Sequence, residues 1–159
     1  MKQKNLEIPI QFNLIQENLP IKRLSDKAIL PTYAHKGDAG MDLYAANDAT
    51  IPCGETVKIP TDVAMAIPTG YVGLIYARSG LATKQGLRPA NCTGVVDAGY
   101  RGNIIVAMYN DSLEPRTIKA GDRIAQMVIT PFISCTLAEV DELDNTERSD
   151  NGFGSSGTN

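Results

Sequence analysis

The sequence predicts an all-β domain, because short runs of β-forming residues recur along the chain and turn-forming residues separate them. The runs occupy residues 8–14, 56–59, 63–67, 71–77, 104–109, 124–129 and 135–140. Proline, glycine and aspartate gather between runs, at residues 52–54, 60–62, 68–70 and 120–122. Short strands with turn residues at about every ten positions are typical of a β-sandwich or barrel.

One short helix is predicted over residues 79–85. Ser79 is a suitable N-cap residue, and Gly86 is of the type that ends helices. No long window of the sequence carries apolar residues at the helical spacing of about 3.6. A helix of one or two turns needs tertiary packing to hold its shape.

The 159 residues fit one domain. We assign residues 1–140 to a single β-domain, with residues 1–20 as an N-terminal arm, and residues 141–159 to a flexible C-terminal tail. The tail is first acidic, then rich in glycine and serine, with Phe153 as its one aromatic residue. Such a tail frays when it is free, and a lone aromatic side chain in it is also a candidate docking residue.

Composition narrows the expected partners and location. The net charge of −3 argues against a general nucleic-acid-binding surface, which normally shows a basic excess. Glu7 and Pro9 interrupt the start of the chain, so no signal peptide is expected, and no apolar run approaches a membrane span. Cys53, Cys92 and Cys135 form no CxxC pair and are expected to be reduced, mostly structural thiols. We therefore expect a cytoplasmic protein, or a nuclear one if its source is eukaryotic or viral.

Three polar segments lie where a strand sandwich does not need them: residues 38–43 (DAGMDL), 77–81 (ARSGL) and 94–102 (GVVDAGYRG). Each has a plain structural alternative. Asp97 suits a hairpin turn, Asp42 a surface carboxylate, and Arg78 an ion pair.

Together the three segments suit phosphate chemistry. The backbone N–H groups at the start of the predicted helix favour an anion, and an Arg78 guanidinium and Ser79 hydroxyl beside them complete an anion-binding cradle. Carboxylates either hold Mg²⁺ and its waters or act as a base. Attack of water on a phosphoryl group needs charge neutralisation and an oriented nucleophile, so the combination points to that reaction.

Five segments in order resemble the motifs of the homotrimeric dUTPases, and the resemblance extends from about residue 20 to the end. They are DAGMDLYA at 38–45, ARSGLA at 77–82, NCTGVVDAGYRG at 91–102, GDRIAQMVI at 121–129 and RSDNGFGSSG at 148–157. The resemblance implies a distorted jelly-roll, barrel-like β fold, and a homotrimer whose sites combine different subunits. It implies Mg²⁺-dependent hydrolysis of dUTP to dUMP and pyrophosphate.

The same resemblance implies the roles of individual residues. Asp97 would orient or deprotonate the attacking water, with Gln126 near the phosphates, and Asp42 would bind waters of a Mg²⁺ ion held mainly by the triphosphate. Tyr100 would pack under the deoxyribose. Phe153 would cover the uracil. The substrate-binding set comprises Arg78, Ser79, Gly80, Asn91, Gly94, Val96, Tyr100, Arg148, Phe153 and Gly154.

One departure and two alternatives accompany the resemblance. Ala98-Gly99 stands where many relatives carry Ser-Asp or Glu-Asp, which removes polar contacts from the turn. The related dCTP deaminases carry a catalytic Glu at the position of Ala107, and Phe in place of Tyr100, so deamination is disfavoured. A non-catalytic dUTP-binding regulator is the other alternative, and enzymatic turnover distinguishes it.

Overall fold

The structure is a computed structural model that describes residues 18–146 and Ser149. The strand predicted at 8–14 and the site residues Arg148, Phe153 and Gly154 lie outside the described residues. Within them the chain forms strands and one helix: β1 (Ile21–Arg23), β2 (Gly40–Tyr44), β3 (Ala49–Ile51), β4 (Thr56–Pro60), β5 (Val63–Met65), β6 (Tyr71–Tyr76), α1 (Ser79–Gln85), β7 (Leu87–Pro89), β8 (Gly94–Val96), β9 (Ile105–Asn110), β10 (Arg116–Ile118) and β11 (Arg123–Pro131).

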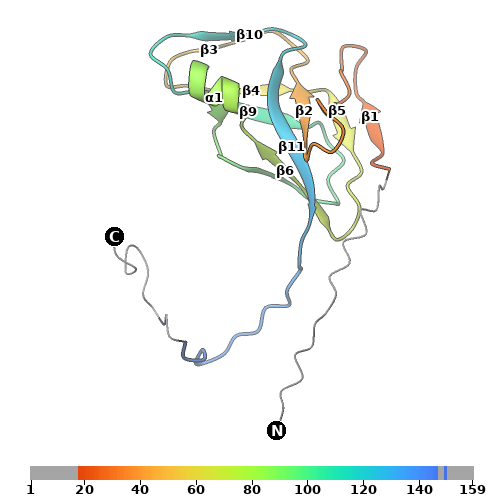
Figure 1. The fold of residues 1–159 in the computed structure, drawn as a ribbon, viewed down its shortest axis with the longest axis vertical. Coiled ribbons are helices and arrows are strands. Elements are labelled where there is room, and N and C mark those ends of the chain that lie inside the picture. The colour runs from red at the N-terminus through yellow and green to blue at the C-terminus, as the bar shows by residue number, and fades with distance from the viewer. Residues whose placement is uncertain (1–17, 147–148, 150–159) are drawn as a thin grey trace.

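The strands form antiparallel sheets. The largest has the order β2-β11-β6-β8, and a second has the order β4-β9-β7. Two pairs, β1-β5 and β10-β3, complete the described fold. Long β11 lies between β2 and β6 (Figure 1), so it carries the centre of the largest sheet. These observations confirm the all-β prediction.

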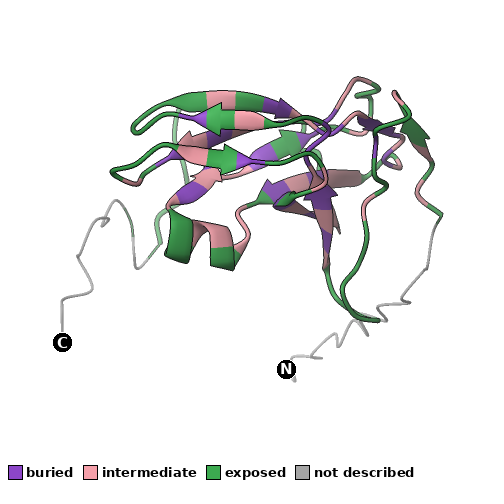
Figure 2. Ribbon diagram, turned by 90° about the horizontal axis from the view of Figure 1, so that it is seen from above, coloured by how far each residue is buried: buried purple, intermediate pink, exposed green. Residues whose placement is uncertain are grey.

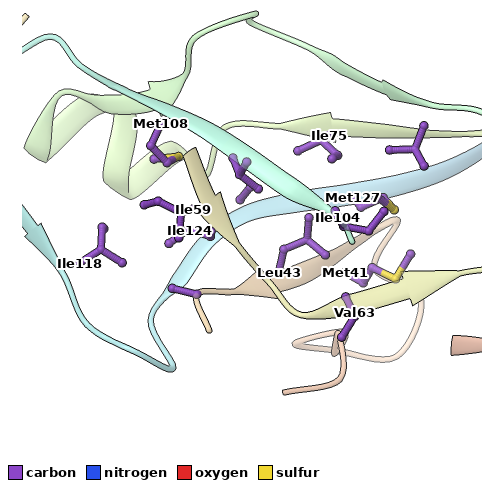
Figure 3. Packing of buried hydrophobic residues seen from close by; sticks show 14 of the residues in the cluster. Met41, Leu43, Ile59, Val63, Ile75, Ile104, Met108, Ile118, Ile124 and Met127 are labelled. Carbon is purple, nitrogen blue, oxygen red and sulfur yellow. The ribbon is translucent and has the colours of Figure 1, made fainter. Parts of the chain in front are cut away.

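One hydrophobic core joins the two larger sheets. Buried positions alternate with less buried ones along β2 and β9, which is the period of a strand with one face inward. Figure 2 shows this mixture of buried and exposed positions along the strands. Met41 and Leu43 of β2 meet Ile59 of β4 and Met127 of β11 in the interior (Figure 3). The sheets therefore pack face to face around apolar side chains.

Most predicted elements are confirmed with small shifts of their ends, including the strands at 56–59, 63–67, 71–77, 104–109 and 124–129. The helix is confirmed as α1. Its N-cap, however, is Arg78, with no side-chain cap hydrogen bond, and Ser79 is the first helical residue. Gly86 ends the helix with a φ of 67°, as its residue type predicts.

The strand predicted at residues 135–140 is wrong for the single chain. Those residues are exposed and form no strand. The segment leaves the body of the molecule after β11 (Figure 1), so no neighbouring strand is available to pair with it. Cys53, Cys92 and Cys135 are free, as predicted, but all three are exposed and take no part in the core. Among the described residues, no helix is long and apolar enough to cross a membrane.

Candidate active site

A pocket of about 240 Å³ lies between β8 and the turn that follows it. Five residues predicted from the sequence share its lining: Asn91, Gly94, Val96, Asp97 and Tyr100. The remaining lining residues are Ile75, Val95, Asn103, Ile104 and Ile105. The pocket thus combines apolar walls with backbone groups, two side-chain amides and one carboxylate, which is a composition suited to a polar ring with an attached sugar.

The entry to β8 is a tight turn that presses against β6. Cys92 adopts a positive φ of 60°, and the N–H of Thr93 donates to the carbonyl of Asn91 at 2.6 Å. Gly94 pairs with Ile75, and a Cβ at Gly94 would lie 3.2 Å from the Cβ of Ile75. A glycine here lets the turn sit close to β6, so its backbone is exposed to the pocket rather than covered by a side chain.

The exit of β8 presents Asp97 and Tyr100. The N–H of Tyr100 donates to the carbonyl of Asp97 at 3.0 Å, which closes the turn. The Tyr100 side chain is 46% exposed, and its hydroxyl donates to the carbonyl of Asn103 at 2.9 Å. Its ring lies on Gly102, where an added Cβ would come within 2.6 Å of the ring carbon Cζ. The ring is therefore a partly exposed platform at the pocket edge.

A cluster of charges lies beyond the C-terminal end of β6, where Arg78 follows the strand. Asp42 of β2 accepts from Arg78 Nε at 2.8 Å on one oxygen and from Arg123 Nη1 at 3.2 Å on the other. The Asp42 side chain is only 13% exposed, so it is not a surface carboxylate. Arg78 does belong to an ion pair, which is the plain alternative for that residue. Two guanidiniums facing one carboxylate leave an excess of positive charge at this place, so the cluster still suits an anion.

Arg123 is the functional candidate that the sequence analysis missed. It begins β11, directly after the turn at residues 120–122, and its position in the segment GDRIAQMVI was the available indication. The carbonyl of Arg123 also accepts from Arg78 Nη1 at 3.3 Å, so the two cations are tied to each other. A cavity of about 230 Å³ opens beside them, lined by Arg78, Leu81, Gln85, Thr117, Ile118, Asp122 and Arg123.

Gln126, Ser79 and Gly80 surround the same cluster. Gln126 Nε2 donates to the carbonyl of Ala77 at 2.9 Å, which ties β11 to the chain entering α1. Its Oε1 lies 2.7 Å from where a Cβ at Gly40 would be, so Gly40 leaves the space that Gln126 fills. Ser79 and Gly80 are exposed in the first turn of α1, whose N–H groups have no helical partner.

The metal predicted from the sequence is Mg²⁺, and the described residues offer it one carboxylate rather than a cage. Within residues 18–146 and Ser149, no group of three His, Cys, Asp or Glu side chains is placed to hold a metal ion. Asp42 has both oxygens engaged by arginines, yet each oxygen keeps a second lone pair. The residues therefore fit an ion held mainly by substrate phosphates, with Asp42 reaching its waters.

Asp97 and Arg78 lie toward opposite ends of β6, although Gly94 of the pocket pairs with Ile75, near the end that leads to Arg78. Val96, next to Asp97, pairs with Gly73, whereas Arg78 follows five residues later. Gly73 lies three residues before the end of β6 at Tyr76, which is about 10 Å at 3.3 Å per residue, and Arg78 follows beyond that end. Hydrogen-bond reach is only about 3 Å. Within one chain, the structure does not bring Asp97 and Arg78 together.

The model of the dUTPase family matches residues 26–157 of the chain. The chain is 49% identical over 146 residues to the deoxyuridine 5'-triphosphate nucleotidohydrolase of Mycolicibacterium gilvum, covering 88% of this chain and 95% of that protein. It is 47% identical to the enzyme of that name from Corynebacterium glutamicum, covering 87% of this chain and 94% of the other.

Solved structures agree with these relatives. The dUTPase of Staphylococcus bacteriophage 80alpha, a mutant with dUpNHpp, superposes with a TM-score of 0.84 at 36% identity, covering 88% of this chain and 98% of that one. A mutant dUTPase from phage phi11 of S. aureus, described for its coordination of a structural Mg(II) ion, gives 0.76 at 32% identity, covering 81% of this chain and 100% of that one. The similarity supports the distorted jelly-roll-like β fold; the described sheets form no closed barrel.

Proposed function

Since this chain belongs to the dUTPase family, we propose that it hydrolyses dUTP to dUMP and pyrophosphate with a water molecule oriented by Asp97. The observation that carries the proposal is one pocket that holds Asp97, Tyr100, Asn91 and Gly94 together. The reaction would keep uracil out of DNA and supply dUMP for thymidylate synthesis.

The pocket suits the nucleoside part of dUTP. Asn91 and the pocket-lining backbone at Gly94 would offer donors and acceptors to the polar edge of uracil, beside the buried side chain of Val96. Cytosine would leave some of those groups unpaired, which a pocket of this kind penalises strongly. Tyr100 would lie under the deoxyribose and leave no space for a 2′-hydroxyl.

Asp97 is proposed to orient the attacking water. It is exposed at the pocket edge, immediately before the turn that carries Tyr100. A carboxylate here accepts a hydrogen bond from the sugar 3′-hydroxyl with one oxygen and from water with the other. That water attacks the α-phosphorus when it lies in line with the leaving pyrophosphate.

The charge cluster would hold the triphosphate. Arg78 and Arg123 supply positive charge, and Ser79 and Gly80 supply N–H groups at the start of α1. Gln126, which pairs with Asp42 across β11 and β2, would turn its amide toward a phosphate. Mg²⁺ would supply further neutralisation of the phosphates when bound, with Asp42 holding its waters. We propose Mg²⁺ as the cofactor on these grounds.

The tail at residues 141–159 is proposed to complete the site. Arg148 would reach the γ-phosphate side, Phe153 would cover the uracil, and the backbone from Gly154 onward would wrap the phosphates. Glycine-rich backbone approaches phosphate oxygens closely, and closure of such a segment excludes water from the reaction.

We propose that the sites are shared between copies of the chain, in a homotrimer. The separation of Asp97 and Arg78 along β6 supports this, because one dUTP must contact both. The exposed segment after β11 supports it as well. Ile133, Leu137 and Leu143 are 88%, 94% and 84% exposed, and apolar side chains in such a row need a surface to cover them.

A mixing experiment tests the shared site. Asp97→Asn and Arg78→Gln copies are each purified, shown to be inactive, then unfolded and refolded together. A mixed oligomer contains sites with an intact Asp97 from one copy and an intact Arg78 from the other, so activity returns. If each site belongs to a single chain, the mixture stays as inactive as its parts. Sedimentation analysis of the wild-type chain gives the oligomeric state independently.

The proposed reaction is tested by following products from dUTP, dCTP and UTP, with Mg²⁺ and with EDTA. Formation of dUMP and pyrophosphate from dUTP alone, lost with EDTA, is the expected result. Binding of dUTP without turnover would instead identify a regulator. Release of ammonia from dCTP would identify a deaminase. Ala107 of β9 disfavours that activity, because its methyl side chain cannot act as a base. The three free thiols suit a reducing compartment, so we propose the cytoplasm as the location.

A further inference from the structure

Few contacts hold the ring of Tyr100 in place. Its hydroxyl donates to the carbonyl of Asn103, and its ring lies on Gly102. The side chain is nearly half exposed, so packing does little to fix it. The position of the ring therefore depends on where the backbone of Asn103 lies.

The side chain of Asn103 ties that backbone to a distant turn. Its Nδ2 donates to Asp62 Oδ1 at 2.8 Å, and the hydroxyl of Ser25 donates to the other oxygen, Oδ2, at 2.7 Å. Asp62 belongs to the turn between β4 and β5, 41 residues earlier in the chain. One carboxylate thus receives two side-chain donors and joins three segments.

The backbone next to this pair is fastened to the same turn. The carbonyl of Ile104 accepts from the N–H of Thr61 at 3.0 Å and from its hydroxyl at 2.7 Å. The N–H of Ile104 donates to the carbonyl of Val63 at 2.9 Å. Thr61 is only 1% exposed, so these bonds are shielded from water. Ile104 is fixed by the main chain, and Asn103 beside it is fixed by Asp62.

Two costs accompany the pair. Asp62 is a non-glycine residue with a positive φ of 53°, a conformation that L residues rarely adopt. The Oδ1 of Asn103 is buried and has no hydrogen-bond partner among the described residues. Unpaired buried acceptors are uncommon because they cost stability. Both costs are accounted for if the donor of Asn103 and the carboxylate of Asp62 serve the pocket.

We propose that Asp62 and Asn103 are positioning residues that hold the Tyr100 ring, and that they thereby set the preference for deoxyribose over ribose. The proposal rests on the function proposed above, in which Tyr100 lies under the sugar. Neither residue needs to touch the substrate's reacting atoms. If the pair is broken, the ring is free to move away from the pocket and leaves space for a 2′-hydroxyl.

Asn103→Asp breaks the pair with almost no change of shape. It places a second carboxylate within hydrogen-bond distance of Asp62, so the two groups repel each other. We expect the ratio of kcat/KM for dUTP to kcat/KM for UTP to fall by about tenfold or more. The fall in kcat/KM for dUTP should come mainly from a higher KM, because Asp97 and the phosphate-binding groups are untouched.

The double variant Asp62→Asn with Asn103→Asp is the rescue. The amide introduced at 62 donates to the carboxylate introduced at 103, while its oxygen accepts from Ser25, so the hydrogen bonds return with reversed polarity. The ratio should return toward the wild-type value. Asn110→Ala is the matched control, since Asn110 Nδ2 ties a loop to the carbonyls of Ile51 and Glu114 away from the pocket. It should lower the unfolding temperature and leave the ratio unchanged.

The outcomes separate this proposal from the proposed function. A wild-type chain that does not hydrolyse dUTP overturns the function itself. A wild-type chain that does, with a ratio unchanged in folded Asn103→Asp, overturns the positioning role. So does a double variant no better than the single one. If Asn103→Asp does not fold, Asp62→Gly decides, because glycine tolerates the positive φ and removes the acceptor of the amide; an unchanged ratio there overturns the proposal too.

Discussion

The two ends of β6 carry parts of the proposed site that are built differently. At one end, the turn after β8 closes a pocket that is built from backbone groups and neutral hydrogen bonds, with Asp97 as its one carboxylate. At the other, Asp42 lies between the guanidiniums of Arg78 and Arg123. The first part would recognise the nucleoside by a shape that exists before binding. The second part would attract the phosphates by its positive charge.

This difference determines how each end should respond to change. A shaped pocket is sensitive to a methyl group, because packed neighbours cannot move without cost. A charge cluster tolerates small steric changes but responds to the loss of one charge and to added salt. Substitutions at the two ends should therefore differ in kind as well as in size.

The largest effect is expected for Asp97→Asn. The amide keeps the shape of the pocket but cannot act as a base for water, so kcat should fall by about 10²–10⁴-fold. Calorimetry should still detect dUTP binding, because base and sugar contacts remain. Asp111→Asn, at an exposed carboxylate 3.8 Å from Arg88, is the control and should keep full activity. Loss of binding together with turnover would show that Asp97 shapes the pocket instead.

Gly102→Ala tests the shape of the same end without replacing a polar side chain. The new Cβ would lie within about 3 Å of three atoms of the Tyr100 side chain, so the ring must move. Overpacking of this kind costs roughly 1–3 kcal/mol, which corresponds to a rise in KM of about 5- to 150-fold. Steady-state kinetics measure it.

Gly99→Ala is the matched control in the same turn. A Cβ there meets nothing within 4 Å, and its φ is not positive. Equal effects of the two substitutions would show that the turn itself, rather than the seat of the Tyr100 ring, is being disturbed. The control also examines the Ala98-Gly99 departure from the family pattern.

Asp42→Asn tests the charged end. Without the carboxylate, Arg78 and Arg123 face each other unneutralised. Their partial exposure, 26% and 49%, allows solvent to screen that repulsion, so the free energy of unfolding should fall by only about 1 kcal/mol. Denaturant unfolding at low and high salt measures it, and high salt should reduce the difference. Arg123→Gln in the same chain should restore part of the loss; no restoration would contradict the charge explanation.

The sequence predicted the parts of this molecule that local patterns encode. Strands β4, β5, β6, β9 and β11, the helix α1 and the shared lining of the pocket by Asn91, Asp97 and Tyr100 were all anticipated, whereas β2 was not. A run of β-branched residues or a glycine turn is a local property of the sequence. The order of the five motifs indicated which turns belong to the proposed site.

The remainder depends on contacts between distant residues. Strands of three residues such as β1, β3 and β10 exist because a partner strand lies beside them, which their own residues do not reveal. The pairing of Asn103 with Asp62 joins positions 41 residues apart and has no local pattern. The strand prediction for residues 135–140 failed for the opposite reason, since these residues have a strand-like pattern but no partner within one chain.

The smallest effect is expected outside both ends of β6, at the ion pair of Asp48 and Lys119, whose charged atoms lie 2.9 Å apart. The N–H of Ala120 and the Lys119 ammonium lower the pKa of Asp48, while Asp48 raises the pKa of Lys119. A lowered carboxyl pKa stabilises the fold above the unfolded-state pKa, and this stabilisation is lost as pH falls through the folded value. The raised pKa of Lys119 stabilises the fold at pH values below the unfolded-state pKa of lysine, and this stabilisation is lost as pH rises through the folded value. Asp48→Asn should therefore lower the unfolding temperature slightly at neutral pH, and the difference should shrink as the pH falls below about 3.9, the ordinary pKa of Asp. A difference that persists in acid would mean that the side chain acts through packing rather than charge, unlike the cluster around Asp42.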